Sequence, residues 1–152
     1  MRRALGDMGG ALAAMRRAHA LMPESVPTLI ELGTTLAEGG DLAGSLEAFR
    51  QAIAIDPQAA EAYNRMGVAY VGAGQLDQAA QAFQRARDLS PDFVFAHYNL
   101  AVTLLKMNRN REALASLLKG MRLAPTDPRL QALYVEIQSR MPPAQGNTRS
   151  IP

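Results

Sequence analysis

The sequence has no cysteine and no tryptophan, and aromatic residues make up only 5% of it. Without cysteine, disulfides and thiolate metal sites are excluded. A β-sheet core is rich in β-branched and aromatic residues, whereas this chain is rich in alanine, which favours closely packed helices. The composition therefore predicts an all-α protein.

Long apolar runs are also missing. No stretch approaches the roughly 18 uninterrupted apolar residues of a membrane span, so we predict no contact with a membrane. The start of the chain resembles a signal peptide because Arg2 and Arg3 precede an Ala/Leu-rich run, but Asp7, Arg16 and Arg17 interrupt that run. We interpret this segment as a helix of a cytoplasmic protein, a location that the absence of cysteine also fits.

Excess charge of one sign is absent, since the formal net charge is only +2. Residues 26–59 carry one arginine against five acidic residues, whereas 94–127 carry five basic residues against two acidic ones. Such a gradient can steer a dipolar partner, although solvated helix faces of varied charge are the simpler explanation. A basic cluster is expected around one turn, formed by Lys106, Arg109, Arg111 and Lys119. No aromatic residues interleave with it for base stacking, so we predict no nucleic-acid partner.

What the sequence does have is a period of 34 residues. It recurs in three series: Pro23, Pro57, Pro91 and Pro125; Gly6, Gly40, Gly74 and Asn108; and Phe49, Phe83 and Leu117. A fixed period in this range indicates a stack of small supersecondary units. The period predicts an α-solenoid of helix-turn-helix repeats.

Apolar spacing, glycine and proline divide the chain into helices. We expect them at residues 5–22, 27–39, 42–55, 60–73, 76–89, 94–107, 110–123 and 128–140. Gly40 and Gly74 tolerate positive φ at the turn within a pair of helices, and Asn108 is the next most permissive choice. Asp127 is the predicted N-cap of the last helix, with Pro128 in its first turn.

The period resembles the tetratricopeptide repeat. The signature of that family is carried in the central copy by Tyr63, Met66, Gly67, Tyr70, Ala79, Phe83, Ala86 and Pro91. The resemblance implies a right-handed α-solenoid of three full repeats at 26–59, 60–93 and 94–127. It also implies an unpaired second helix at 4–23, a C-terminal capping helix at 128–141 and, by composition, a disordered tail at 142–152. We predict that small residues of the first helices face small residues of the second, as Gly33 faces Ser45, Gly67 faces Ala79 and Ala101 faces Ala113.

The resemblance also implies a function. In this family the first helices line a concave groove that receives a peptide, so the chain is expected to be a non-catalytic protein–protein interaction scaffold. Matching positions predict a groove of Ile30, Thr34, Asn64, Val68, Val71, Tyr98, Val102 and Leu105. Glu61, Lys106 and Arg129 are expected near its margins. The carboxylate clamp of some relatives is not expected, because Ile30, Thr34, Phe95 and Asn99 occupy its positions.

Residues suited to catalysis are sparse. The two histidines, His19 and His97, lie in different repeats without a paired acid, and we interpret both as packing residues. The chain has neither a glycine-rich phosphate loop nor a Gly-x-Ser-x-Gly elbow. No active site, metal site or cofactor is therefore predicted.

Two alternatives stay open at the level of sequence. The chain is also consistent with the repeat arm of a larger enzyme, such as a glycosyl- or sulfotransferase. A second alternative is self-assembly through the unpaired opening helix, with Leu12, Met15 and His19 as the candidate contacts.

Overall fold

The computed structural model describes residues 2–141, which form eight α-helices and no strand. The helices are α1 (Arg2–Leu21), α2 (Val26–Glu38), α3 (Leu42–Ile55), α4 (Ala60–Gly72), α5 (Leu76–Leu89), α6 (Val94–Lys106), α7 (Asn110–Leu123) and α8 (Pro128–Arg140). Every boundary lies within three residues of the one predicted from sequence. The tail predicted to be disordered, 142–152, lies outside the described residues.

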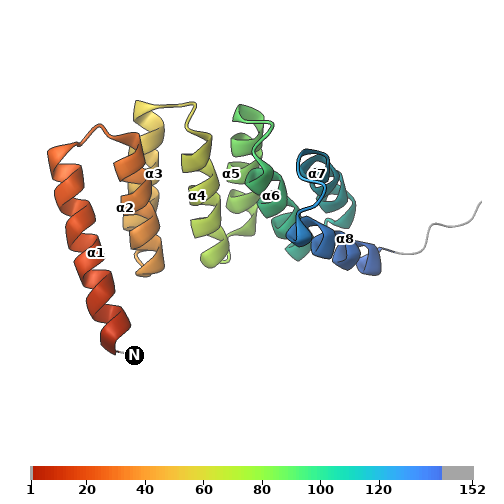
Figure 1. Ribbon diagram of the computed structural model, residues 1–152, viewed down its shortest axis with the longest axis horizontal. Coiled ribbons are helices and arrows are strands. Elements are labelled where there is room, and N and C mark those ends of the chain that lie inside the picture. Colours follow the sequence, from red (N-terminus) through yellow and green to blue (C-terminus); the bar gives the residue numbers. More distant parts are fainter. Residues whose placement is uncertain (1, 142–152) are drawn as a thin grey trace, which may run out of the picture.

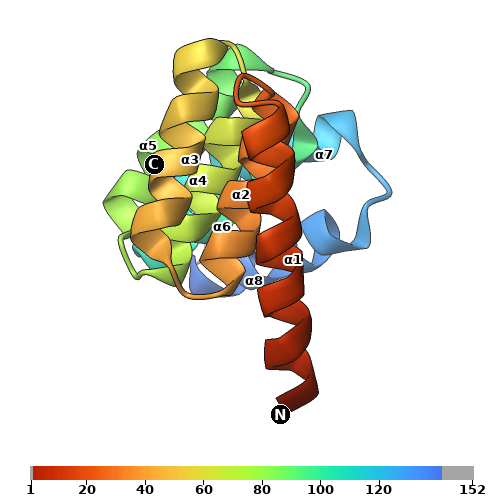
Figure 2. The same ribbon diagram turned by 90° about the vertical axis from the view of Figure 1, so that its left-hand side faces the viewer.

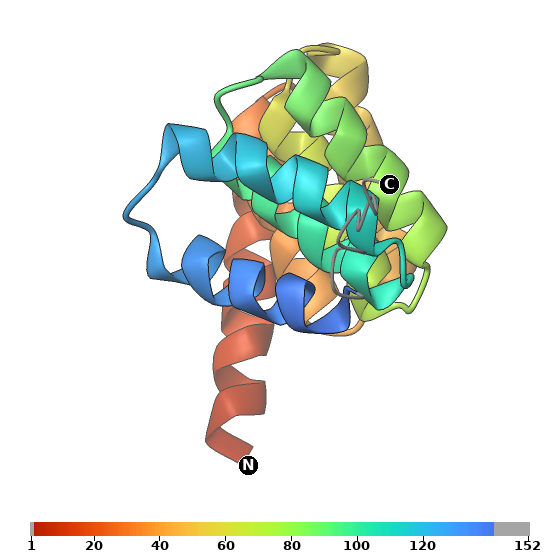
Figure 3. The ribbon, with the colours of Figure 1, turned by 90° about the vertical axis from the view of Figure 1, so that its right-hand side faces the viewer.

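The helices stack in sequence order as an α-solenoid (Figure 1). Three hairpins, α2–α3, α4–α5 and α6–α7, form its body, with α1 against α2 at one end and α8 against α7 at the other (Figures 2 and 3). Successive first helices contact one another in the order α2, α4, α6 and α8, whereas in the described chain no second helix contacts the next second helix. The first helices therefore line the concave side, and the second helices spread over the convex side.

A residue with positive φ ends the first helix of each hairpin. The φ angles are 84° at Gly40, 73° at Gly74 and 59° at Asn108. Side chains with a Cβ are disfavoured in this region by roughly 1–2 kcal/mol, which explains glycine at two turns and asparagine at the third. The turn chemistry predicted from the 34-residue series is confirmed.

Within a hairpin, glycine of the first helix lies directly against a phenylalanine ring of the second. A Cβ added to Gly33 would lie 2.7 Å from Phe49 Cε1, and one added to Gly67 would lie 2.6 Å from Phe83 Cε1. Both rings are almost completely buried. The atoms nearest to such a Cβ thus belong to Phe49 and Phe83, one helical turn beyond the small residues that the sequence analysis paired with these glycines.

The buried core is divided unevenly along the solenoid. The largest cluster joins helices α5 to α8, and a second one joins α2 to α4. Tyr70 packs against both clusters and connects them. At the first end, Leu12 and Met15 of α1 pack against a small cluster that includes Leu32 and Leu36. Two of the three residues predicted for self-association therefore attach α1 to its own chain.

Candidate functional site

The concave face contains a hollow of about 490 Å³ between α6 and α8. It is lined by Tyr98, Val102, Leu105, Lys106, Arg129, Ala132, Leu133, Glu136 and Arg140. Three of these residues were predicted for the groove and two more for its margins. The remaining four come from α8, which the sequence analysis treated only as a cap. The sequence did contain a signal for this arrangement. Ala132 and Glu136 follow Arg129 by three and seven residues, which places all three on one face of a helix.

Arg129, which lines this hollow, contacts two aromatic rings. The Arg129 guanidinium carbon lies 4.8 Å from the ring centroid of Phe95 and 5.9 Å from that of Tyr98, within the range of cation–π attraction. Arg129 also donates to Asp127, and this hydrogen bond holds the pKa of the Asp127 carboxyl at about 2, below its ordinary value of 3.8. Lys106 has no ion-pair partner among the described residues. Its ammonium group is therefore available to an acidic ligand.

A second hollow of the concave face, of about 410 Å³, lies at the ends of α2 and α4. It is lined by Ala37, Glu38, Gly40, Leu42, Val68, Ala69, Gly72 and Ala73, of which only Glu38 is charged. Val68 is the predicted groove residue that lines it, and it is 48% exposed although it is apolar. This end of the groove is therefore suited to an apolar side chain.

Three of the predicted groove residues are buried between helices. Ile30 is 8% exposed, Asn64 is 6% exposed and Leu105 is 3% exposed. The Asn99 side-chain amide donates to Asn64 Oδ1 at 3.0 Å and so joins α4 to α6. These residues support the concave face from within, while Val68 presents its side chain to solvent.

The other predicted groove residues are partly exposed. Tyr98 and Val102 line the hollow between α6 and α8, and Val71 packs at the edge of the large core cluster. Thr34 is half-buried, and its hydroxyl donates to the Ile30 carbonyl oxygen at 2.8 Å. At the predicted margin, Glu61 pairs with Arg65 at 2.6 Å. The predicted groove residues that remain at least partly exposed thus lie mainly on α4 and α6.

The two histidines lie far from each other and have different surroundings. His97 is 2% exposed, and its Nε2 lies 2.8 Å from the Pro91 carbonyl oxygen, whereas His19 is half-buried on α1. Among the described residues, no three His, Asp or Glu side chains gather where they would hold a metal ion. Within the same residues, no helix combines the length and apolar character required to cross a bilayer.

The predicted basic cluster is not a single cluster in the structure. Arg109 forms an ion pair with Glu112 at 2.7 Å, which raises the pKa of Arg109 and lowers that of Glu112. Lys106 lines the concave hollow, whereas Lys119 lines a hollow on the convex side. The prediction was wrong for Lys119, because this residue lies near the far end of α7, away from the α6–α7 turn.

Comparisons with known proteins agree with this architecture. Residues 70–137 match the family described as "Tetratricopeptide repeat", and residues 33–74 match "TPR repeat". No curated protein sequence matches significantly.

Solved structures show the same fold. The crystal structure of MamA is 26% identical with a TM-score of 0.73, over 91% of this chain and 87% of that one. The thermophilic TPR protein TTC0263 of Thermus thermophilus is 25% identical with a TM-score of 0.77, over 91% and 76%. The first TPR domain of Spaghetti (RPAP3), solved with the HSP90 peptide SRMEEVD, is 15% identical with a TM-score of 0.71, over 75% and 93%.

The period, the helix pairs, the glycine–phenylalanine contacts and both family matches agree. This chain belongs to the tetratricopeptide repeat family.

Proposed function

We propose that this chain is a non-catalytic protein-interaction module that binds a partner peptide along its concave face. The observation that carries the proposal is the pair of hollows on that face, one apolar at α2 and α4 and one bordered by cations at α6 and α8. A peptide with an apolar side chain towards one end and an acidic group towards the other matches both. The RPAP3 domain, whose structure holds an HSP90 peptide, provides a precedent for peptide binding on this fold.

The proposed contacts are the predicted groove residues that remain accessible: Thr34, Val68, Val71, Tyr98 and Val102. Ile30, Asn64 and Leu105 take a supporting role because they are buried. Lys106 is the proposed partner of an acidic group, since its side chain is exposed at the hollow. Hydrophobic anchors in such hollows provide most of the binding free energy, and the cation provides orientation.

The test begins with selection of binding peptides from a random library on the wild-type chain. Selected peptides are then measured by isothermal titration calorimetry against the double variant Val68→Ser/Tyr98→Ser. We expect affinity to fall by about 100-fold, because each truncated anchor costs on the order of 1–2 kcal/mol. A matched control is Ile55→Ser/Leu118→Ser, which removes two exposed apolar side chains from second helices. Equal loss of affinity in both double variants contradicts the proposed groove.

A further inference from the structure

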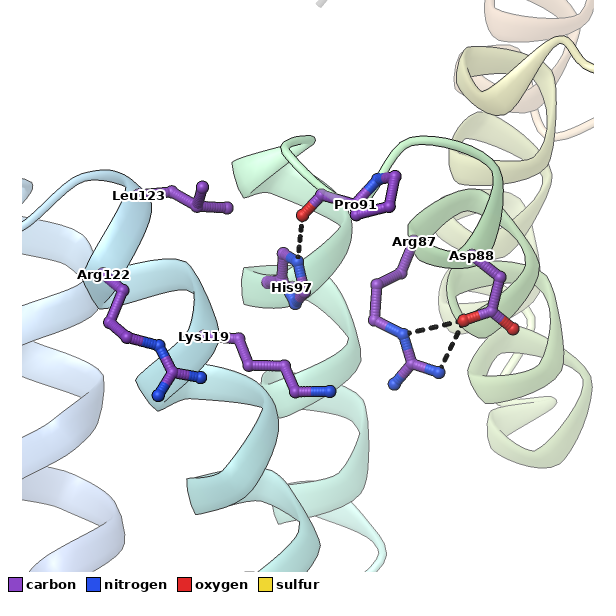
Figure 4. A pocket seen from close by; sticks show the side chains of 7 residues that line it. All are labelled: Arg87, Asp88, Pro91, His97, Lys119, Arg122 and Leu123. Atoms are coloured by element: carbon purple, nitrogen blue, oxygen red, sulfur yellow. Dashed lines mark hydrogen bonds and ion pairs between the residues drawn. The ribbon is translucent and has the colours of Figure 1, made fainter.

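A third hollow, of about 450 Å³, lies on the convex side between the last turns of α5 and α7 (Figure 4). It is lined by Arg87, Asp88, Pro91, His97, Lys119, Arg122 and Leu123. It shares no lining residue with either concave hollow. Its volume falls within the roughly 300–1,000 Å³ typical of small-molecule sites.

Three cationic side chains converge on this hollow from two helices. Figure 4 shows the Lys119 ammonium group between the guanidinium groups of Arg87 and Arg122, in a row beneath His97. Arg87 donates to Asp88 Oδ1 at 2.8 Å, whereas Lys119 and Arg122 have no ion-pair partner among the described residues. Like charges held close together raise the electrostatic energy unless an anion lies between them. The hollow therefore carries two uncompensated positive charges.

The helix dipoles explain only part of this arrangement. Arg87 and Arg122 stand in the last turns of α5 and α7, where the negative end of the helix dipole stabilises a cation. The effect falls off beyond the last turn. Lys119 precedes the last turn of α7 and yet points into the same space. The dipole of α7 therefore contributes less to the placement of Lys119 than to that of Arg122.

His97 forms the inner wall of the hollow. Its Nε2 must carry the hydrogen of the 2.8 Å contact with Pro91, because a carbonyl oxygen can only accept. Its Nδ1 is buried and has no hydrogen-bond partner among the described residues. In this tautomer Nδ1 can only accept a hydrogen bond, so it does not bind an anion. His97 therefore shapes the wall of the hollow, and the cationic side chains supply its charge.

The space continues along the convex side. A smaller hollow of about 180 Å³ shares Arg87 and Lys119 with the first one and adds the polar side chains of Gln84 and Ser116. Glu112 also lines it, and its carboxylate is paired with Arg109. The combined cleft has room for more than a bare inorganic anion.

We propose that this convex cleft binds the phosphate group of a small phosphorylated ligand, held by Lys119 and Arg122 with Arg87 at its edge. A phosphate dianion matches the two uncompensated charges. Guanidinium groups donate two parallel hydrogen bonds to phosphate oxygens, and an ammonium group adds a compact charge. The cleft that includes Gln84 and Ser116 receives the remainder of the ligand.

The proposal is tested on the full chain, labelled with nitrogen-15, by titration with inorganic phosphate and separately with glycerol 3-phosphate at constant ionic strength. We expect saturable amide shifts at His97, Lys119 and Gly120. In the double variant Lys119→Gln/Arg122→Gln the affinity is expected to fall at least tenfold, because hydrogen bonds to charged groups are among the strongest in proteins. Both side chains are exposed, so the thermal unfolding midpoint is expected to stay close to that of the wild type.

The matched control is Arg16→Gln/Arg17→Gln, which also removes two exposed cations that have no ion-pair partner among the described residues. Retained affinity in this control supports a specific site. Tighter binding of the ester identifies a phosphorylated ligand, and equal binding identifies free phosphate. The absence of saturable shifts overturns the proposal, and so does an equal loss in both double variants, because it would reveal only a general effect of net charge.

Discussion

In the hairpins α2–α3 and α4–α5 a glycine faces a phenylalanine ring, whereas the corresponding positions of α6–α7 hold Ala101 and Leu117. Both members of the third pair are fully buried in the large core cluster. Compared with the other two hairpins, α6 carries an additional methyl group at Ala101, and α7 carries leucine instead of phenylalanine at position 117. The comparison indicates that the combined volume of the two side chains is constrained, so a change at one position requires a compensating change at the other.

The largest expected effect comes from breaking the glycine–phenylalanine contact. Gly67→Leu places a branched side chain where even a Cβ would lie 2.6 Å from Phe83 Cε1. We expect the free energy of unfolding to fall by about 3 kcal/mol or more, at the upper end of overpacking effects. Urea denaturation followed by circular dichroism measures the change.

Glycine at an open position of the same helix provides the control for that prediction. A Cβ added to Gly72 meets nothing within 4 Å. Gly72→Ala is expected to be neutral or to stabilise the fold by up to about 1 kcal/mol, whereas Gly67→Ala destabilises it. Equal effects of the two alanine substitutions would contradict the contact.

A smaller effect is expected from converting the third hairpin to the arrangement of the other two. Leu117→Phe alone introduces a ring beside Ala101, and we expect a loss of about 1–2 kcal/mol. The double variant Leu117→Phe/Ala101→Gly recreates the pair found at Gly67 and Phe83. We therefore expect it to recover part of the stability that Leu117→Phe loses. A double-mutant cycle by urea denaturation measures the coupling, and purely additive effects would show that volume is not exchanged between the two positions.

The smallest effect concerns the cap of α8, which differs from the four preceding helices in having a side-chain hydrogen bond at its N-terminus. Because the pKa of Asp127 is lowered to about 2, its contribution to stability is present above its ordinary value of 3.8 and is lost as the pH falls through about 2. In Asp127→Asn, which retains an acceptor for the cap, we expect a shallower decline in stability between about pH 4 and pH 2.

Urea midpoints across that pH range measure the Asp127 contribution. Asp77→Asn is the control, since Asp77 is an exposed carboxyl in the first turn of α5 and forms no ion pair in the described chain. If stability declines with falling pH as steeply in Asp127→Asn as in the wild type, other carboxyl groups cause most of the loss of stability in acid.

The features predicted well from sequence are those that depend on local chemistry or on the repeat. Helix boundaries follow proline and glycine, and positive φ at Gly40, Gly74 and Asn108 follows the need for permissive residues at one turn position. The N-cap role of Asp127 also depends only on its immediate neighbours, and it is confirmed. Each of these features depends on residues that are close together in the sequence, so it can be predicted without knowing how the helices pack.

Exposure was predicted less well because it depends on which neighbour covers a residue. Ile30 and Leu105 lie on the predicted concave stripe, but adjacent helices bury them. Similarly, helical spacing places Ser45 and Phe49 on one face of α3 but does not say which of them meets Gly33. The hollow between α6 and α8 exists only because of where α8 packs. The sequence of a single repeat does not determine that position.

The hydrogen bond between Asn99 and Asn64 has a consequence for the mechanics of the solenoid. A hydrogen bond is directional, so it resists rotation of α6 against α4, whereas the hydrophobic effect between apolar side chains has no preferred direction. Among the described residues no side-chain hydrogen bond joins α2 to α4. These two helices instead share one core cluster, whereas Asn64 and Asn99 lie on helices of different clusters. The hydrogen bond is therefore expected to limit bending of the solenoid where the two clusters meet, and so to preserve the curvature of the concave face.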